Sequence, residues 1–335
     1  MTHELALSTD DYSGSFAKIR GRLMDSKGVF LSEFLKTLRP NYGRVFFDIA
    51  CGYAALVATL VLVGYAQTIG VPFAAAVLLG AILVGYWCNF LISFIHEASH
   101  WNLAASRKLN DLIANSLLSW LNGMEVNFYR RVHFEHHRSL GTTADTEYSY
   151  FFPLNLKFLL RALFGLRVVE TIFSYQAPKE ASDSVADKRK SGNKRAFYTT
   201  FLLALLAHLS LVASLWWADF TAAALAWVLG VGCAMPTFAS VRQILEHRSD
   251  QADPSLDYFE IEHGAVTRHF GDGILASTFG SAGFNRHLLH HWEPQVSYTR
   301  LGDLEHFLAD TPLKLLLDRR RSTYLEALRR LFSLH

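Results

Sequence analysis

The sequence predicts an all-α integral membrane protein with four transmembrane helices in two hairpins, interfacial helices and a cytoplasmic helical cap. Hydrophobic residues form 51% of the 335-residue chain, and charged residues are sparse inside long apolar blocks and dense between them. The apolar blocks are long enough to cross a bilayer and follow one another in pairs. Histidine clusters recur just beyond the ends of these blocks, in the segments that would form the cap.

Four apolar blocks define the predicted spans. They cover about residues 45–66, 71–95, 196–217 and 220–241. An uncharged turn at 67–70 joins the first two, and a brief turn at Ala218-Asp219 joins the last two. Pro236 is expected to kink the fourth helix, because proline lacks the N–H that a helix interior uses. The chain therefore predicts two helical hairpins.

The basic residues predict the orientation of these hairpins. Lysine and arginine crowd residues 1–44, whereas the two hairpin turns carry almost none. By the positive-inside rule, both termini and the histidine clusters lie in the cytoplasm. We therefore expect a cytoplasmic N-terminal segment (1–44), a membrane domain (45–310) and a basic C-terminal helix (311–335). The first forty residues lack the apolar run of a cleaved signal peptide.

Two stretches between the hairpins are predicted to lie at the membrane surface. Lys108–Gly123 is amphipathic and is typical of an interfacial helix. Phe151–Phe173 is apolar but interrupted by proline and basic residues, which favours an interfacial helix pair over a true span. The charged stretch Ser182–Lys194 is interpreted as a solvated loop that also anchors to anionic lipid.

Three histidine clusters carry the chemistry of the sequence. Residues 133–137 read H-x-x-H-H, residues 287–291 repeat that spelling, and residues 96–100 read H-x-x-x-H. With fifteen histidines in the chain, one H-x-x-H-H is expected by chance about 0.03 times. Because helix positions i, i+3 and i+4 share a face, each H-x-x-H-H is predicted to offer three imidazoles to one point.

A ninth candidate ligand, His247, follows Gln243 by four residues at the end of the fourth block. Nine imidazoles are too many for one tetrahedral zinc and suit two metals of higher coordination number. An iron pair would bind and activate O₂ and break an unactivated C–H bond. The candidate metal ligands are His96, His100, His133, His136, His137, His247, His287, His290 and His291.

Carboxylates lie between and beside these histidines. The candidates for accepting a ring N–H, and so for fixing a ligand's tautomer, are Glu97, Glu135, Asp145, Glu147 and Glu246. We expect this role first for Glu246 and Asp145. His208 has no neighbour at ligand spacing, so a hydrogen-bonded packing role within the third span is predicted.

The context of the clusters resembles a known family. Arg131-Val132-His133-Phe134-Glu135-His136-His137-Arg138, followed by Asp145, resembles the second histidine box of the membrane-bound fatty acid desaturase superfamily. Asn285–Pro294, followed by Tyr298 and Leu301, resembles its third box and tail. The resemblance covers roughly 45–310 and implies a non-haem di-iron oxygenase whose metals are bound by the eight clustered histidines. His247 matches the family's Asn-x-x-x-His pattern, in which Gln243 replaces asparagine.

The resemblance also implies two iron ions, O₂ as co-substrate and a fatty acyl substrate, with desaturation to a cis alkene as the expected reaction. Hydroxylases and terminal-alkene-forming fatty acid decarboxylases of the superfamily carry similar boxes and stay open as alternatives.

The sequence has no recognisable dinucleotide, haem or cysteine-ligand motif, so electrons are expected from a separate ferredoxin, rubredoxin or cytochrome-type donor. Arg130, Arg131 and Lys188–Lys190 could dock an acidic carrier or bind lipid head groups. The near-neutral net charge does not suggest nucleic acid.

Two other classes of protein are alternatives. His96-Glu97-x-x-His100 is also H-E-x-x-H, the zinc metalloprotease motif with Glu97 as general base, but this leaves both H-x-x-H-H motifs unexplained. A transporter is disfavoured because the clusters lie beyond the spans. An apolar channel ending at the metals is expected between the hairpins. Gly80 and Gly85 are candidates for lining it, with close helix packing as the alternative.

Overall fold

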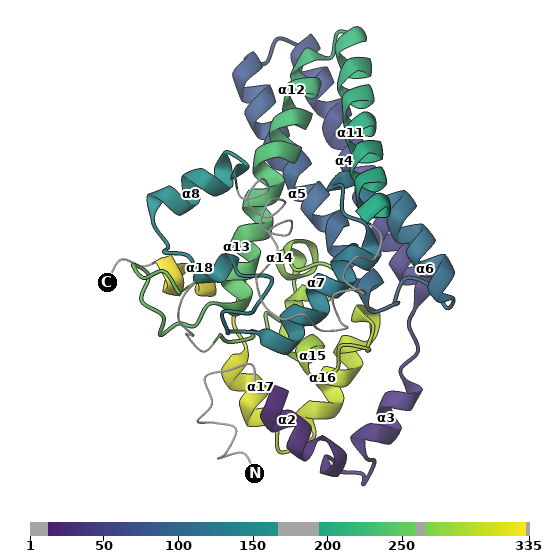
Figure 1. Ribbon diagram of the computed structural model, residues 1–335, viewed down its shortest axis with the longest axis vertical. Helices are drawn as coiled ribbons and strands as arrows, with labels where there is room; N and C mark the ends of the chain where they lie inside the picture. Colours follow the sequence, from purple (N-terminus) through teal and green to yellow (C-terminus); the bar gives the residue numbers. More distant parts are fainter. Residues whose placement is uncertain (1–12, 167–193, 259–264, 333–335) are drawn as a thin grey trace.

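The computed structural model describes residues 13–166, 194–258 and 265–332. Over these residues the chain is all helical, and only two isolated bridges, Met24 with Phe30 and His269 with Arg321, pair strand-like segments. Long helices stand side by side at one end of the molecule, and shorter helices form a cap at the other (Figure 1). The predicted all-α class is confirmed.

Among the described residues, four helices are long and apolar enough to cross a membrane, as predicted. They are α4 (Tyr42–Thr68), α5 (Phe73–Ser99), α11 (Lys194–Trp217) and the continuous run α12 (Thr221–Leu229), η5 (Gly230–Ala234) and α13 (Met235–His247). α5 and α13 run further than the predicted spans, because their helical hydrogen bonds continue into the polar residues that carry histidines. α5 is central: 56% of its most apolar 18-residue segment is buried, against 28% for the corresponding segment of α4.

The fourth helix, for which the sequence predicts a kink at Pro236, is irregular just before that residue. Its turn Gly230–Ala234 is π-helical and comes just before the proline. Pro236 has no N–H to donate to the carbonyl of residue 232, so the helix accommodates a wider turn at this level.

The two hairpin turns are joined at the end away from the cap. Gly70 and Asp219 both adopt positive φ, 78° and 61°. Gln67 donates from Nε2 to the Asp219 carbonyl over 2.7 Å, and its Oε1 accepts from the Ala222 N–H over 2.8 Å. The Gln67 side chain thus ties the first hairpin to the second. It satisfies the Asp219 carbonyl and the Ala222 N–H without water.

Gly80 and Gly85 pack helices together and do not line a channel. A Cβ on Gly80 would lie 2.6 Å from Val63 and 2.9 Å from Ala226, and one on Gly85 would lie 2.7 Å from the Met235 backbone nitrogen. The channel role considered for these glycines is therefore wrong. The alternative, close approach of α5 to its neighbours, is what the structure has, because only a missing side chain lets the helices come this near.

The cap is built from helices of both chain ends and of the segment between the hairpins. The helices that precede the third span are α2 (Ser13–Ile19), α3 (Leu31–Thr37), α6 (Arg107–Ile113), α7 (Val126–Ser139) and α8 (Leu156–Leu163). Those that follow the fourth are α14 (Ile274–Phe279), α15 (His287–Trp292), α16 (Leu301–Ala309), α17 (Lys314–Arg320) and α18 (Tyr324–Phe332). Figure 1 shows α2 and α3 beside α15 to α17, where apolar side chains of both chain ends form one core.

The predicted interfacial stretches are helical with interruptions. α6 continues into a π-helical turn, Ala114–Leu118, and a 3₁₀ turn, Ser119–Leu121. α8 buries Phe158 and exposes Leu156, Leu163 and other apolar residues, as a helix at a membrane surface would. The remainder of the predicted pair and the 182–194 loop, up to residue 193, lie outside the described residues.

The C-terminal segment differs in detail from the expected single basic helix. It forms α17 and α18, which are separated by an extended break at Arg321. α18 buries Tyr324, Ala327 and Leu331, so one face of the basic segment belongs to the core of the cap.

The glycine packing predicts unequal effects of two equivalent substitutions. Gly85→Ala places a methyl group against the backbone of residues 234–235, whereas Gly232→Ala places it in open space. Overpacking is expected to cost Gly85→Ala about 1–3 kcal/mol of unfolding free energy, while Gly232→Ala is expected to be neutral or stabilising. Thermal unfolding of the purified variants in one detergent measures this. Equal stabilities would contradict the close approach of α5 and α13.

Candidate metal centre

The nine candidate histidines come together at the end of the membrane helices that faces the cap. α5 contributes His96 and is followed by His100, α13 ends at His247, and the cap helices α7 and α15 bring the other six. The nine side chains divide into two groups, one of five and one of four. All are buried except His137, which is half-buried.

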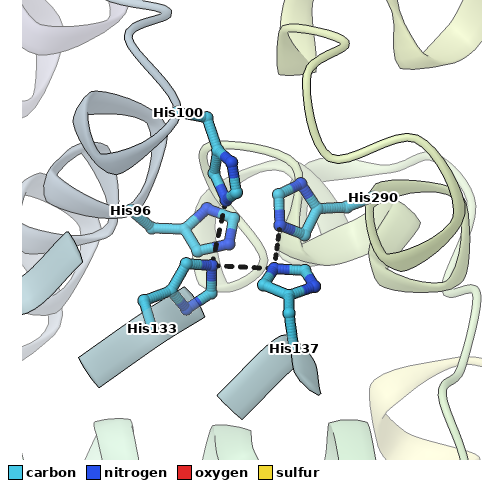
Figure 2. Close-up of side chains that lie close together, drawn as sticks. All are labelled: His96, His100, His133, His137 and His290. Carbon is cyan, nitrogen blue, oxygen red and sulfur yellow. Dashed lines mark hydrogen bonds between the residues drawn. The ribbon is translucent and has the colours of Figure 1, made fainter. Parts of the chain in front are cut away.

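The five-histidine group lies between α5, α7 and α15. It consists of His96, His100, His133, His137 and His290, and one nitrogen of each lies within 4.8 Å of one nitrogen of every other. The Nε2 atom of His133 is 3.0 Å from that of His100 and 2.9 Å from that of His137. The Nε2 atoms of His137 and His290 are 3.0 Å apart. Figure 2 shows the five rings turned toward one another.

The four-histidine group adjoins the first. It consists of His136, His247, His287 and His291, again with one nitrogen from each within 4.8 Å of the others. The Nε2 atoms of His247 and His287 are 2.9 Å apart. The rings of His137 and His291, one from each group, have centroids only 4.4 Å apart, so the groups form one continuous centre.

Each H-x-x-H-H motif is split between the two groups, which corrects the expectation that its three imidazoles converge on one point. His133 and His137 belong to the five-histidine group, and His136 belongs to the four-histidine group. In the third box, His287 and His291 belong to the four-histidine group, and His290 belongs to the five-histidine group. The reason is helical geometry: successive residues are rotated by about 100°, so positions i+3 and i+4 point in different directions.

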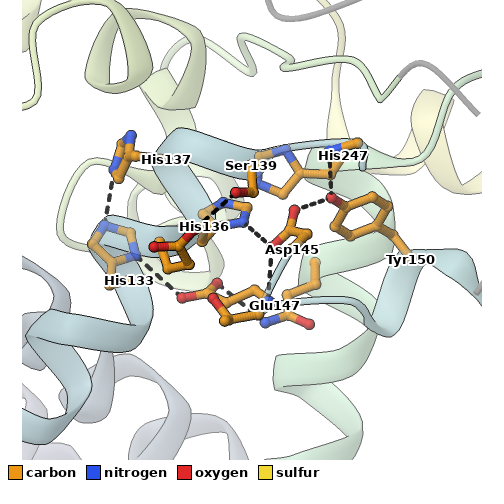
Figure 3. Close-up of polar contacts among 12 residues, drawn as sticks. His133, His136, His137, Ser139, Asp145, Glu147, Tyr150 and His247 are labelled. Atoms are coloured by element: carbon orange, nitrogen blue, oxygen red, sulfur yellow. Dashed lines mark hydrogen bonds and ion pairs between the residues drawn. The ribbon is translucent and has the colours of Figure 1, made fainter. Parts of the chain in front are cut away.

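Acceptors on the far side of the rings fix the tautomers. His133 donates from Nδ1 to Glu147 over 3.1 Å, and His136 donates from Nδ1 to Asp145 over 2.8 Å. His247 donates from Nδ1 to the Val266 carbonyl over 3.3 Å. A carboxylate or carbonyl can only accept, so each Nδ1 carries the proton and each Nε2 presents a lone pair to the centre. Figure 3 shows the contacts of His133 with Glu147 and of His136 with Asp145.

Asp145 is itself held in place. Its carboxylate accepts from the Tyr150 hydroxyl and, over 2.8 Å, from the Glu147 backbone N–H. Tyr150 in turn accepts from the Gly141 N–H over 3.0 Å. Asp145 is 3% exposed as a residue, so these contacts leave its side chain one orientation toward His136.

The donor set fits metal cations. His133 and His247 each direct a lone pair toward a second imidazole nitrogen 2.9–3.0 Å away, a spacing at which one cation could bind both rings. Both ring nitrogens of His96 are buried without a hydrogen-bond partner among the described residues. Burial, reinforced by neighbouring imidazoles, lowers the pKa of His137, His287 and His290 well below the ordinary value. The rings are therefore neutral at neutral pH, the form that binds metals.

The other predicted partners of the histidines have different places. Glu246 is buried, and its carboxylate lies 3.9 Å from His287 Nε2 and 3.6 Å from Arg242 Nε, beyond hydrogen-bond distance of both. Gln243 donates to Glu147 over 3.2 Å and so supports the acceptor of His133. Glu135 accepts from Arg138 over 2.6 Å and from Ser139 over 3.0 Å on the outer side of α7.

Glu97 does not have the position of a protease base. It is fully buried and accepts from the Tyr298 backbone N–H over 3.1 Å, which ties α5 to the segment after the third box. His96 and His100 share their centre with three further histidines. Both observations argue against the H-E-x-x-H interpretation.

Arg130 is a structural residue and not part of a docking surface. It is buried and donates to the carbonyls of Ser99 and Ala98, over 2.8 Å and 2.9 Å, at the C-terminal end of α5. An arginine there satisfies free carbonyls and matches the helix dipole. Arg131, the next residue of that predicted surface, is exposed, and Lys188–Lys190 lie outside the described residues.

Two histidines away from the centre have structural partners. His208 accepts from Trp227 Nε1 over 3.1 Å, in line with the predicted packing role. His269, for which the sequence suggested nothing, is buried and contacts Glu305 over 2.9 Å in the cap. His263 lies outside the described residues.

A cavity of about 230 Å³ adjoins the centre between α5 and α13. His96 and Glu147 form part of its wall, and Ile92, Ile95 and Met235 add apolar surface. It offers a path by which a molecule could reach the histidines from the side of the membrane helices.

The comparisons with known proteins agree with this centre. The sequence profile described as "Fatty acid desaturase" matches residues 72–321, which is more than half of the chain and includes all nine histidines. No curated protein gives a significant match. The chain therefore belongs to the fatty acid desaturase family and is an oxidoreductase of that family.

Proposed function

We propose that the five-histidine and four-histidine groups each bind one iron ion, and that the enzyme uses O₂ to oxidise an unactivated C–H bond of a fatty acyl chain. The observation that carries this proposal is the convergence of buried, neutral imidazoles into two adjoining groups. Desaturation to a cis alkene is the first expectation. Hydroxylation and decarboxylation to a terminal alkene use the same kind of centre and are told apart by their products.

Two bound irons would supply reductive activation of O₂ beside the substrate. His133, His136 and His247 would hold the metals through Nε2, because Glu147, Asp145 and the Val266 carbonyl keep these rings oriented and their Nδ1 atoms protonated. The carboxylates also increase the basicity of the imidazoles they accept from. Burial of the rings keeps bulk water away from the reacting carbon.

The electron balance requires a partner. Desaturation removes two hydrogens, and so two electrons, from the acyl chain, whereas reduction of O₂ to two waters consumes four. The remaining two electrons must come from outside the substrate. We propose a separate carrier of the ferredoxin, rubredoxin or cytochrome type, which docks on the cap.

The membrane orientation follows from the charges of the chain. The basic segments before the first span and after the fourth lie at the same end as the histidines, opposite the two hairpin turns (Figure 1). By the positive-inside rule we propose that this end, with both termini and the metal centre, faces the cytoplasm.

Iron binding is expected to depend on the Asp145 contact. Asp145→Asn keeps the shape of the side chain but removes the negative charge that strengthens His136 as a ligand. We expect about 10-fold weaker iron retention, measured as iron per chain after dialysis against graded chelator. Glu135→Gln is the matched control, because Glu135 pairs with Arg138 outside the centre. An equal loss in both variants would contradict a specific role for Asp145.

The metal and the reaction are tested together. Protein supplied with iron is expected to hold about two irons per chain, and its expression in a lipid-producing host to yield O₂-dependent unsaturated acyl products by mass spectrometry. Hydroxylated acids as the product would indicate a hydroxylase in place of a desaturase. Terminal alkenes would indicate a fatty acid decarboxylase. A single tightly bound zinc, with cleaved peptides as the product, would replace the proposal by a metalloprotease.

Reporter fusions test the orientation. Fusions in the turn at 67–70 and at Ala218 are expected to report the side opposite to fusions at Lys190 and at the C-terminal His335. An extracytoplasmic signal at Lys190 would overturn the arrangement of four spans.

A further inference from the structure

The cavity beside the metal centre is polarised along its length. Ile92, Met235 and Ala239 line the part deeper in the membrane helices, one to two turns before the polar residues of the same helices. Arg242, Gln243 and Glu147 line the part next to the centre. An apolar chain would fit the first part, and a charged head group the second.

Arg242 is the cation at the polar end. It is 8% exposed, and its Nη1 donates to Ser93 Oγ over 2.9 Å. Its Cζ lies over the Phe284 ring, 3.4 Å from the ring centroid. The Nε–H has no hydrogen-bond acceptor among the described residues, because the nearby Glu246 carboxylate is 3.6 Å away.

Such a cation needs an explanation beyond packing. A buried N–H without an acceptor is costly, and a buried ionisable side chain within a membrane helix is a candidate functional residue. Glu246 lies beside the guanidinium without filling this hydrogen bond. Glu147, the other charged group of the cavity wall, already accepts from His133 and Gln243. An acceptor brought by a ligand would complete the set of bonds that Arg242 can make.

Arg242 and the histidines are separated by the ring of Phe284, which contacts both. The centroid of this ring lies 4.3 Å from that of His96 and 5.0 Å from that of His287. A carboxylate bound to Arg242 would therefore leave only its first few carbons beside the metal-facing nitrogens.

We propose that Arg242 binds the carboxylate of a free fatty acid, which enters with its chain along the apolar part of the cavity and presents carbons 2 to 4 to the metal centre. This rests on the proposed di-iron function and specifies its substrate. Oxidation in the middle of a chain would instead need apolar wall on both sides of the centre, and one side is formed by Arg242, Gln243 and Glu147.

A second cavity, of about 460 Å³, provides an internal comparison. Arg44 and Arg286 line it together with Trp87 and Phe94, on another face of α5. None of the nine histidines is among the residues that line it in the described part of the chain. A head group bound there would place a more distant part of the chain at the metals, so the two cavities predict different products.

Binding without turnover tests the proposal directly. Iron-loaded protein in nanodiscs is titrated anaerobically with palmitate, methyl palmitate and palmitoyl-CoA. Wild type is expected to bind palmitate about 10- to 100-fold more tightly than methyl palmitate, which lacks the charge. Arg242→Gln is expected to remove that difference, and Arg242→Lys to restore part of it. Arg44→Gln, the matched control in the second cavity, is expected to leave it unchanged.

Several outcomes would overturn the proposal. These are equal binding of palmitate and its methyl ester by wild type, tighter binding of palmitoyl-CoA than of palmitate, or loss of the palmitate preference in Arg44→Gln alone. The wild-type comparison needs no variant, so it decides even if Arg242→Gln fails to keep its iron.

The position of oxidation gives a second readout. Products changed at carbons 2 to 4, or an alkene shortened by the carboxyl carbon, would support carboxylate binding at Arg242. A double bond in mid-chain would overturn this inference and leave the proposed di-iron function standing. Iron-loaded protein that oxidises no acyl compound would instead remove the proposed function, whatever the binding results.

Discussion

The arrangement of the molecule depends on holding nine imidazoles close together in a buried centre. Ring nitrogens there lie 2.9–3.0 Å apart, and His133 and His247 direct lone pairs toward neighbouring rings. Nothing about a single helix would favour that geometry. It is maintained because acceptors behind the rings take the Nδ1 protons and because rigid helices carry the side chains.

The helices bring histidines to the centre from two directions. α5 and α13 bring histidines at the ends of membrane helices, while α7 and α15 bring them from the cap. The end of α5 is fastened by Arg130, whose guanidinium lies 4.3 Å from the ring centroid of Trp101. Arg107 is the same distance from that ring. Trp101 has a φ of 60°, which is unfavourable for a bulky residue, so these contacts offset backbone strain directly after His100.

The two sides of the histidine centre differ in the chemistry of their surroundings. On the side of Glu147 and Asp145, carboxylates would stabilise positive charge at any bound metal. On the side of the cavity, apolar wall from the membrane helices meets Arg242 and its aromatic neighbour Phe284. An acyl chain and a charged group can therefore reach the centre together. The family relation by itself does not specify how they are placed.

The sequence alone determined the helical class, the four apolar helices, the family and the gathering of nine histidines, because apolar block length and ligand spacing are local properties of the chain. Only the tertiary structure decided how the histidines divide, since the direction of an imidazole depends on the rotation of its helix against three others. It gave Glu147 and the Val266 carbonyl their contacts to histidine rings, turned Glu135 outward and placed Glu246 beyond hydrogen-bond distance. It also made Gly80 and Gly85 packing residues, and set Arg242 beside a cavity. Each of these outcomes depends on which helix faces which, and that is settled by packing across the whole fold rather than by neighbours in the chain.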